Sequence, residues 1–128
     1  MKAVLVIDDS AMMRKIILRQ LSQAGIPVDS ALEAADGDEA LALLRERTPT
    51  LILCDVNMPN LSGLELLARM REENLAPDVP VVMITTENSE AQVRQALALG
   101  ARGYIRKPFT VDDLKATVAP LLTAAQLI

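Results

Sequence analysis

Residues Ala3 to Asp9 read AVLVIDD, a run of five apolar residues that ends in two aspartates. Two later stretches share this design, because Thr50 to Asp55 reads TLILCD and Val81 to Thr86 reads VVMITT. Short, nearly continuous apolar runs of this kind are typical of strands that are buried on both faces, as in parallel sheets. We therefore expect strands at residues 3–7, 50–54 and 81–85.

Segments with helical periodicity separate the apolar runs. Apolar residues recur at helical spacing over residues 13–24, and Gly25 and Pro27 are expected to end that helix. Residues 38–47 carry acids in the first turn and bases in the last, which complements the helix dipole. Pro120 cannot donate a backbone hydrogen bond, so we expect the last helix to kink or end early there. The remaining expected elements are strands at residues 30–34 and 103–106 and helices at 63–73, 90–99 and 114–122.

This alternation predicts five βα units, and therefore an α/β fold. Its sheet should be parallel and doubly wound, with right-handed crossovers and helices on both faces. A chain of 128 residues suits one domain and should bury roughly two-thirds of its unfolded surface.

Composition excludes several classes of function. The formal net charge is −4 and the pI is about 4.8, so direct binding to nucleic acid or to an anionic membrane is not expected. The absence of histidine excludes histidine metal sites and Ser-His-Asp triads. A single cysteine, Cys54, excludes an internal disulfide and fits a reducing compartment. Because no apolar stretch resembles a secretion signal or a membrane span, we expect a soluble cytoplasmic domain.

Polar side chains follow the expected strands at the edge where parallel α/β sheets bind ligands. Taken singly, the aspartates and threonines could be helix caps and the lysine a solvated surface charge. Taken together, three carboxylates repel by roughly 4 kcal/mol per close pair at an effective dielectric of about 20, which calls for a compensating cation. The residues concerned are Asp8, Asp9, Asp55, Thr85, Thr86 and Lys107.

The available donors favour one metal and one type of chemistry. Carboxylate oxygens without histidine or a thiolate cluster favour Mg²⁺. A divalent cation, a carboxylate and a lysine suggest phosphoryl transfer, in which a carboxylate can itself become the acceptor as an acyl phosphate. Asp55, on the central strand between the acid pair and Lys107, is the candidate acceptor. No glycine-rich phosphate loop follows any strand, so a bound nucleotide is not expected as the donor.

These residues together resemble the receiver domain of two-component response regulators, over essentially the whole chain, residues 1–128. Within that family the chain is most similar to the single-domain chemotaxis regulators of the CheY type. The resemblance implies a flavodoxin-like sheet of strand order 2-1-3-4-5. It also implies a signalling switch that catalyses only its own phosphorylation and dephosphorylation. The motifs that carry it are Asp8-Asp9, Asp55, NMPN at 57–60, GLELL at 63–67, Thr85 and GYIRKPFT at 103–110.

The resemblance assigns roles in the acid cluster. Asp55 would accept the phosphoryl group. Asp9 and Asp55, with the backbone carbonyl of Asn57, would bind Mg²⁺, and Asp8 would act mainly through a water on the ion. Lys107 would pair with the phosphoryl group.

The resemblance also assigns switch residues. The bond between Lys107 and Pro108 would be cis. The hydroxyl of Thr85 would move onto the phosphoryl oxygens, and Tyr104 would turn inward into the space that Thr85 leaves. Without the resemblance, Tyr104 would be interpreted as an ordinary half-buried aromatic residue.

Partners also follow from the resemblance. A histidine kinase would donate the phosphoryl group, and a phosphatase could remove it. The output face would comprise residues 90–99, 103–106 and 111–122, which in the chemotaxis relatives binds the flagellar motor switch.

The resemblance implies that two positions, Asn57 and Glu87, tune the lifetime of the phosphoryl group. Asn57 and Glu87 match the chemotaxis pattern and imply a short lifetime. Thr86 departs from the family, in which this position is usually alanine or glycine. We expect its larger side chain to slow phosphotransfer or dephosphorylation relative to a Thr86→Ala variant.

Other functions remain as alternatives. A dehalogenase-type phosphatase would need a second aspartate where this chain has Asn57. A flavodoxin-like electron carrier would place FMN phosphate beside Asp8 and Asp9, which would repel it. Inside the family, the alternatives are a phosphorelay or phosphate-sink receiver and the receiver part of a longer transcriptional regulator. The stretch Thr123–Ile128 is expected either to close the last helix or to mark such a boundary.

Overall fold

The computed structural model describes residues 3–86 and 89–122, and it forms one parallel sheet of five strands. The strand order is β2-β1-β3-β4-β5, as the resemblance implied. Along the chain the elements are β1 (Ala3–Ile7), α1 (Ala11–Gln23), β2 (Ser30–Ala34), α2 (Gly37–Glu46), β3 (Leu51–Asp55), α3 (Gly63–Glu72), β4 (Val81–Thr85), α4 (Glu90–Ala98), β5 (Gly103–Arg106), α5 (Val111–Val118) and the 3₁₀ turn η1 (Ala119–Leu121).

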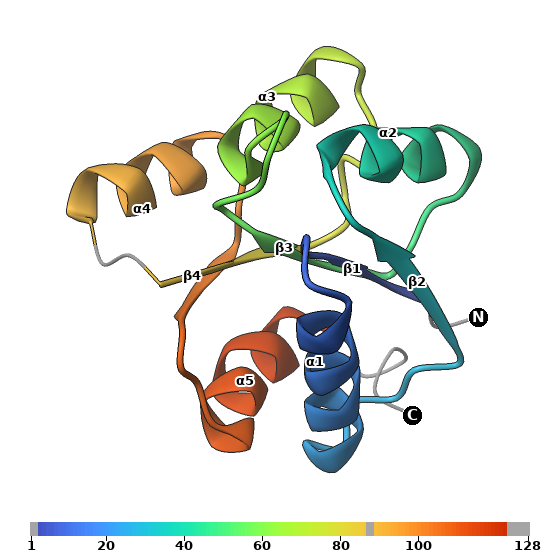
Figure 1. The fold of residues 1–128 in the computed structure, drawn as a ribbon, viewed down its shortest axis with the longest axis vertical. Coiled ribbons are helices and arrows are strands. Elements are labelled where there is room, and N and C mark those ends of the chain that lie inside the picture. The colour runs from blue at the N-terminus through green and yellow to red at the C-terminus, as the bar shows by residue number, and fades with distance from the viewer. Residues whose placement is uncertain (1–2, 87–88, 123–128) are drawn as a thin grey trace.

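The helices cover both faces of the sheet, as predicted. Figure 1 shows α2, α3 and α4 on one side and α1 and α5 on the other. Alternate residues of each central strand therefore enter two separate cores, with Leu5 and Ile7 in one and Val4 and Val6 in the other. Every residue of β1, β3 and β4 is buried, which explains why the three strands are apolar except for Asp55 and Thr85 at their ends.

Most ends of the elements lie within two residues of the predictions, whereas α5 begins three residues earlier and ends four residues earlier than predicted. β3 runs one residue further than predicted and includes Asp55, because Asp55 pairs with Ile84 of β4. α1 ends at Gln23, and Gly25 follows with a φ of 78°. α5 ends at Val118, ahead of Pro120, which confirms the predicted early end. The stretch Thr123–Ile128 lies outside the described residues.

The helix caps come from residues other than the candidate site residues. The side chains that accept the N-terminal backbone hydrogen bonds of α1 to α5 belong to Ser10, Asp36, Ser62, Ser89 and Thr110. The alternative in which the aspartates and threonines at the strand ends are the helix caps is therefore wrong for these five helices.

Gly63 brings α3 close to the end of β3. Its backbone N–H donates to the Val56 carbonyl at 2.9 Å. A Cβ at this position would overlap the Asp55 carbonyl oxygen and would lie 2.7 Å from the Met83 methyl group and 2.9 Å from the Val56 Cα. The missing side chain thus lets the first turn of α3 touch the strand that carries Asp55.

We predict that Gly63→Ala destabilises the fold by about 1–3 kcal/mol, the usual cost of overpacking. Helix propensity alone predicts the opposite sign, since alanine is favoured over glycine by about 1 kcal/mol. Urea unfolding followed by far-UV circular dichroism measures the difference.

The matched control is Gly37→Ala, because Gly37 is also the first residue of a helix, α2. There the three atoms nearest to an added Cβ all belong to the side chain of Leu61, at 2.6–2.9 Å, and a side chain can move more easily than backbone. We expect Gly37→Ala to lower the free energy of unfolding by less than Gly63→Ala does. An equal or greater stability of Gly63→Ala relative to the wild type would contradict this account.

Candidate functional site

The three predicted carboxylates meet at the carboxyl edge of the sheet. Each of Asp8, Asp9 and Asp55 offers an oxygen, and these oxygens lie within 4.8 Å of one another. Asp8 and Asp55 are buried at the ends of the adjacent strands β1 and β3, whereas Asp9 is exposed. The structure therefore forms a compact acid cluster with one open side.

Lys107 is the cation that contacts this cluster. Its Nζ lies 3.1 Å from Asp8 Oδ2 and 3.7 Å from Asp55 Oδ2, and its side chain is 15% exposed. Its backbone N–H donates to the Thr85 carbonyl at 2.6 Å, and the bond to Pro108 is cis, as the resemblance implied. One ammonium group thus contacts two of the three carboxylates and reduces the repulsion between them.

The cost of burying a carboxylate appears in the pKa of Asp55. Burial, with a smaller contribution from Asp8, raises the pKa of its carboxyl to about 6. Lys107 and the backbone N–H of Asn57 oppose this increase. A second cation beside the cluster would favour the ionised carboxylate, because an opposite charge nearby lowers a carboxyl pKa.

Two polar residues border Asp55. The Asn57 N–H donates to Asp55 Oδ1 at 3.3 Å, and the Asn57 Nδ2 donates to the Thr85 hydroxyl at 3.4 Å. Thr85 is fully buried at the end of β4, whereas Thr86, the next residue, is exposed. The structure thus brings Asn57 and Thr85 to the cluster, whereas Thr86 is open to solvent at the end of β4.

The remaining switch residues lie further away. Tyr104 is half-buried on β5, and its hydroxyl donates to Gln92 Oε1 of α4 at 3.1 Å. This bond connects an edge strand to the helix beside it. Pro108 is exposed. Glu87 lies outside the described residues, and its proposed role stays a prediction.

The sequence analysis did not predict the residues that form hydrogen bonds with the backbone and carboxylate of Asp8. Arg14 Nη1 donates to the Asp8 backbone carbonyl at 2.7 Å, and Arg14 Nε donates to Glu33 Oε1 at 2.9 Å. The Ser10 N–H donates to Asp8 Oδ1 at 2.9 Å. Glu33 reaches this position because it pairs with Val6 across the ladder from β2 to β1. The position of Arg14 in the first helix after Asp8-Asp9 was the available signal.

The acid cluster fits a magnesium ion. Mg²⁺ prefers hard oxygen ligands in an octahedron at about 2.0–2.1 Å, which puts neighbouring oxygens about 3 Å apart and opposite ones about 4 Å apart. Small side-chain rotations would bring the three carboxylates into that range. Asp9, as the exposed member, leaves room for water and for a further ligand.

The chain belongs to the response regulator receiver domain family, which its residues 4–119 match. A chemotaxis protein CheY homolog from Campylobacter jejuni is 43% identical over 119 residues, which cover 92% of this chain and 90% of that protein. The phosphate regulon transcriptional regulatory protein PhoB from Pseudomonas aeruginosa is 37% identical over 121 residues, which cover 94% of this chain and 52% of PhoB.

The fold comparison agrees with the sequence matches. The solved structure of chemotaxis protein CheY4 from Vibrio cholerae superposes with a TM-score of 0.83 at 35% identity, covering 95% of this chain and 99% of that chain. The chain is a receiver domain with a CheY-like fold, and the phosphatase and flavin-carrier alternatives are set aside. Within the described residues, the helices are all too short or too polar to cross a bilayer.

Proposed function

We propose that this chain, as one receiver domain over residues 1–128, accepts a phosphoryl group from a histidine kinase onto Asp55 in the presence of Mg²⁺. Phosphorylation then changes the face formed by α4, β5 and α5, which binds an output partner in chemotaxis. The observation that carries the proposal is the meeting of Asp8, Asp9 and Asp55 with Lys107 at the carboxyl edge of the sheet.

The metal site in this proposal uses Asp9, Asp55 and the backbone carbonyl of Asn57, with Asp8 acting through water. When bound, Mg²⁺ neutralises negative charge on the carboxylates and on the incoming phosphoryl oxygens. The raised pKa of Asp55 supports this requirement, because burial disfavours the charged carboxylate and a cation beside it would favour that form.

The chemical step transfers the phosphoryl group between two nucleophiles. A carboxylate oxygen of Asp55 forms a bond to phosphorus while the bond from phosphorus to the donor's histidine nitrogen breaks. The electron pair of that bond stays on the imidazole, and Asp55 becomes an acyl phosphate. Lys107, with its Nζ 3.7 Å from Asp55 Oδ2, is close enough to bind an oxygen of the transferred group.

Switching follows from the new charge. An acyl phosphate on Asp55 adds close to one negative charge and three acceptor oxygens. The Thr85 hydroxyl oxygen accepts a long hydrogen bond of 3.4 Å from Asn57, and its own O–H can donate to a phosphoryl oxygen on Asp55. An inward turn of Tyr104 would break its bond to Gln92 and so remove one contact between β5 and α4. This difference in contacts biases two packings of the same face.

The chemotaxis assignment is supported by the relatives. The CheY homolog from Campylobacter jejuni carries chemotaxis in its name and matches this chain over 90% of its own length. On that reading, the output partner is the flagellar motor switch. Leu97 of α4, which is 51% exposed, is an apolar residue on the proposed output face.

A second candidate function is a receiver module of another pathway. The match to PhoB spans 52% of that transcriptional regulator, so the same module also serves longer regulators. A phosphorelay or phosphate-sink receiver would use the same chemistry at Asp55. Capture of flagellar switch proteins by the phosphorylated protein favours the chemotaxis assignment, and failure of that capture favours these alternatives.

The test of the phosphoryl chemistry is intact mass after incubation with a small acyl-phosphate donor. We expect one added phosphoryl group in the wild type, only when Mg²⁺ is present, and none in Asp55→Asn. Asp112→Asn is a matched control, since Asp112 is an exposed aspartate at the start of α5, away from the cluster. It should be modified like the wild type.

A modified Asp55→Asn protein would show that another residue is the acceptor. An unmodified wild type that also fails to bind beryllofluoride would contradict the phosphoryl switch.

Thr86 gives a further prediction about lifetime. Thr86→Ala should speed phosphotransfer or dephosphorylation by about threefold, ~0.6 kcal/mol in the barrier, because a smaller residue opens the outer border of the cluster. The decay of the phosphorylated species, followed by mass spectrometry, measures this effect. Thr86→Val keeps the size and removes the hydroxyl, and it should behave like the wild type. Equal rates for Thr86→Ala and the wild type would contradict the prediction.

A further inference from the structure

A second cationic side chain, that of Arg14, contacts the acid cluster through the Asp8 backbone and not through a carboxylate. Arg14, in the first turns of α1, donates from Nη1 to the Asp8 backbone carbonyl at 2.7 Å. Its side chain is 15% exposed, so this contact is largely shielded from water. Such a short hydrogen bond from a charged donor is among the stronger kinds in proteins.

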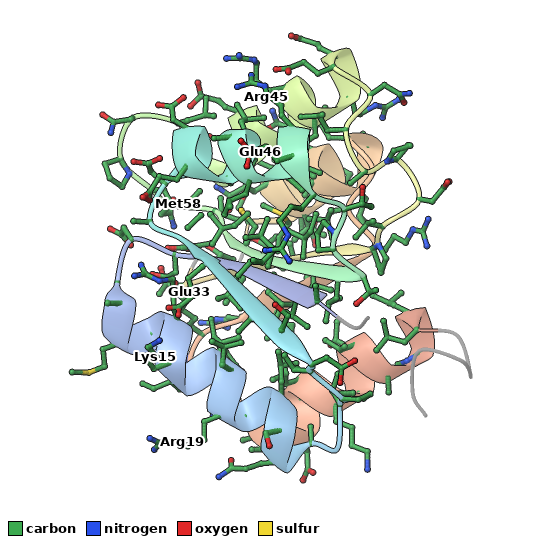
Figure 2. The ribbon with its side chains drawn as sticks, turned by 90° about the vertical axis from the view of Figure 1, so that its right-hand side faces the viewer. Lys15, Arg19, Glu33, Arg45, Glu46 and Met58 are labelled. Atoms are coloured by element: carbon green, nitrogen blue, oxygen red, sulfur yellow. The ribbon has the colours of Figure 1, made fainter. Side chains whose placement is uncertain are left out.

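The direction of the guanidinium is set by Glu33. Arg14 Nε donates to Glu33 Oε1 at 2.9 Å, and Lys15 Nζ donates to Glu33 Oε2 at 2.7 Å. Figure 2 shows Lys15 and Glu33 facing one another on the same side of the molecule. The hydrogen bond from Lys15, with a smaller contribution from Arg14, lowers the pKa of the Glu33 carboxyl, which therefore stays charged at neutral pH.

Asp8 is consequently held at four points. Its backbone N–H donates to the Ala34 carbonyl at 3.1 Å, and its carbonyl accepts from Arg14. One carboxylate oxygen accepts from the Ser10 N–H and the other from Lys107 Nζ at 3.1 Å. The carbonyl of Asp8 belongs to the planar peptide that joins Asp8 to Asp9. A hydrogen bond that holds this carbonyl therefore also positions the backbone nitrogen of the exposed Asp9.

We infer that Arg14, oriented by Glu33, is a positioning residue for the divalent cation site, because it fixes the peptide between Asp8 and Asp9. This inference rests on the proposed function, since it concerns the Mg²⁺ site of that proposal. Arg14 contacts the Asp8 backbone carbonyl and Glu33, so it would not itself be a ligand of the cation. It acts through the Asp8 carbonyl, as residues behind metal ligands do when they orient those ligands.

The direction in which Mg²⁺ affinity changes when Arg14 is replaced distinguishes a positioning role from a purely electrostatic one. Arg14 is positive, so its repulsion weakens binding of a cation at the cluster, and its loss would by charge alone tighten Mg²⁺ binding. Positioning predicts the reverse, because a mobile peptide would cost binding free energy to order. Loss of an orienting residue of this kind typically weakens metal binding by about 10- to 100-fold.

The experiment measures the Mg²⁺ dissociation constant by isothermal titration calorimetry for the whole chain and its variants. We expect Arg14→Met to weaken Mg²⁺ binding by about 10-fold or more. Lys15→Met is the matched control, because Lys15 is the neighbouring residue, carries the same charge and contacts Glu33 but has a side chain that is 68% exposed. It should change the dissociation constant by less than about threefold, the effect of an exposed ion pair.

Two milder variants keep the test informative if Arg14→Met fails to fold in urea and circular dichroism controls. Arg14→Lys keeps the charge but loses the fork that contacts Asp8 and Glu33 together, so it should weaken Mg²⁺ binding. Glu33→Gln removes the negative charge that orients the Arg14 guanidinium, and it should weaken Mg²⁺ binding less than Arg14→Lys does. For each variant, the increase in the Mg²⁺ dissociation constant must exceed the increase for Lys15→Met.

The outcomes distinguish the inference from the proposed function. A wild type that binds Mg²⁺, with Arg14→Met equal to or tighter than Lys15→Met, overturns the positioning role and leaves the proposed site intact. A wild type that binds no Mg²⁺ overturns the proposed site itself. Weaker binding in Arg14→Met, with Lys15→Met unchanged, supports the positioning role.

Discussion

The arrangement of the site depends on the repulsion among three carboxylates that the sheet forces together. Parallel strands deliver Asp8, Asp9 and Asp55 to one edge, and Lys107 is the ammonium group that faces them. Burial of Asp55 makes the repulsion more costly, as its raised pKa shows. A site of this kind gains stability from a divalent cation. In our account, adding a phosphoryl group changes the same balance of charge and thereby moves Thr85 and Lys107.

Much of the fold could be predicted because burial on both faces leaves a strong pattern in the sequence. The central strands appear in the sequence as nearly continuous apolar runs. Gly25 and Pro120 indicated helix ends, because glycine readily adopts a positive φ and proline has no backbone N–H to donate. The boundary of β3 was less predictable. Asp55 is polar, yet it stays in the strand because its pairing with Ile84 continues the ladder.

The candidate site was predictable where residues end a strand or follow it directly. Asp8, Asp55, Thr85 and Lys107 converge because the topology alone sets their places. Arg14 and Glu33 were not predicted, because their meeting depends on the rotation of α1 against the register of β2 with β1. The bond from Tyr104 to Gln92 was missed for a similar reason, since it depends on how α4 packs beside β5.

The central claim is that charge at Asp55 is coupled to the face formed by α4, β5 and α5. The most direct measurement is an amide NMR spectrum of the Mg²⁺-loaded protein before and after addition of beryllofluoride, a phosphoryl mimic. Our account predicts chemical-shift changes at Asp55, Thr85 and Lys107, and also at Tyr104 and along α4. Changes confined to the acid cluster would contradict it.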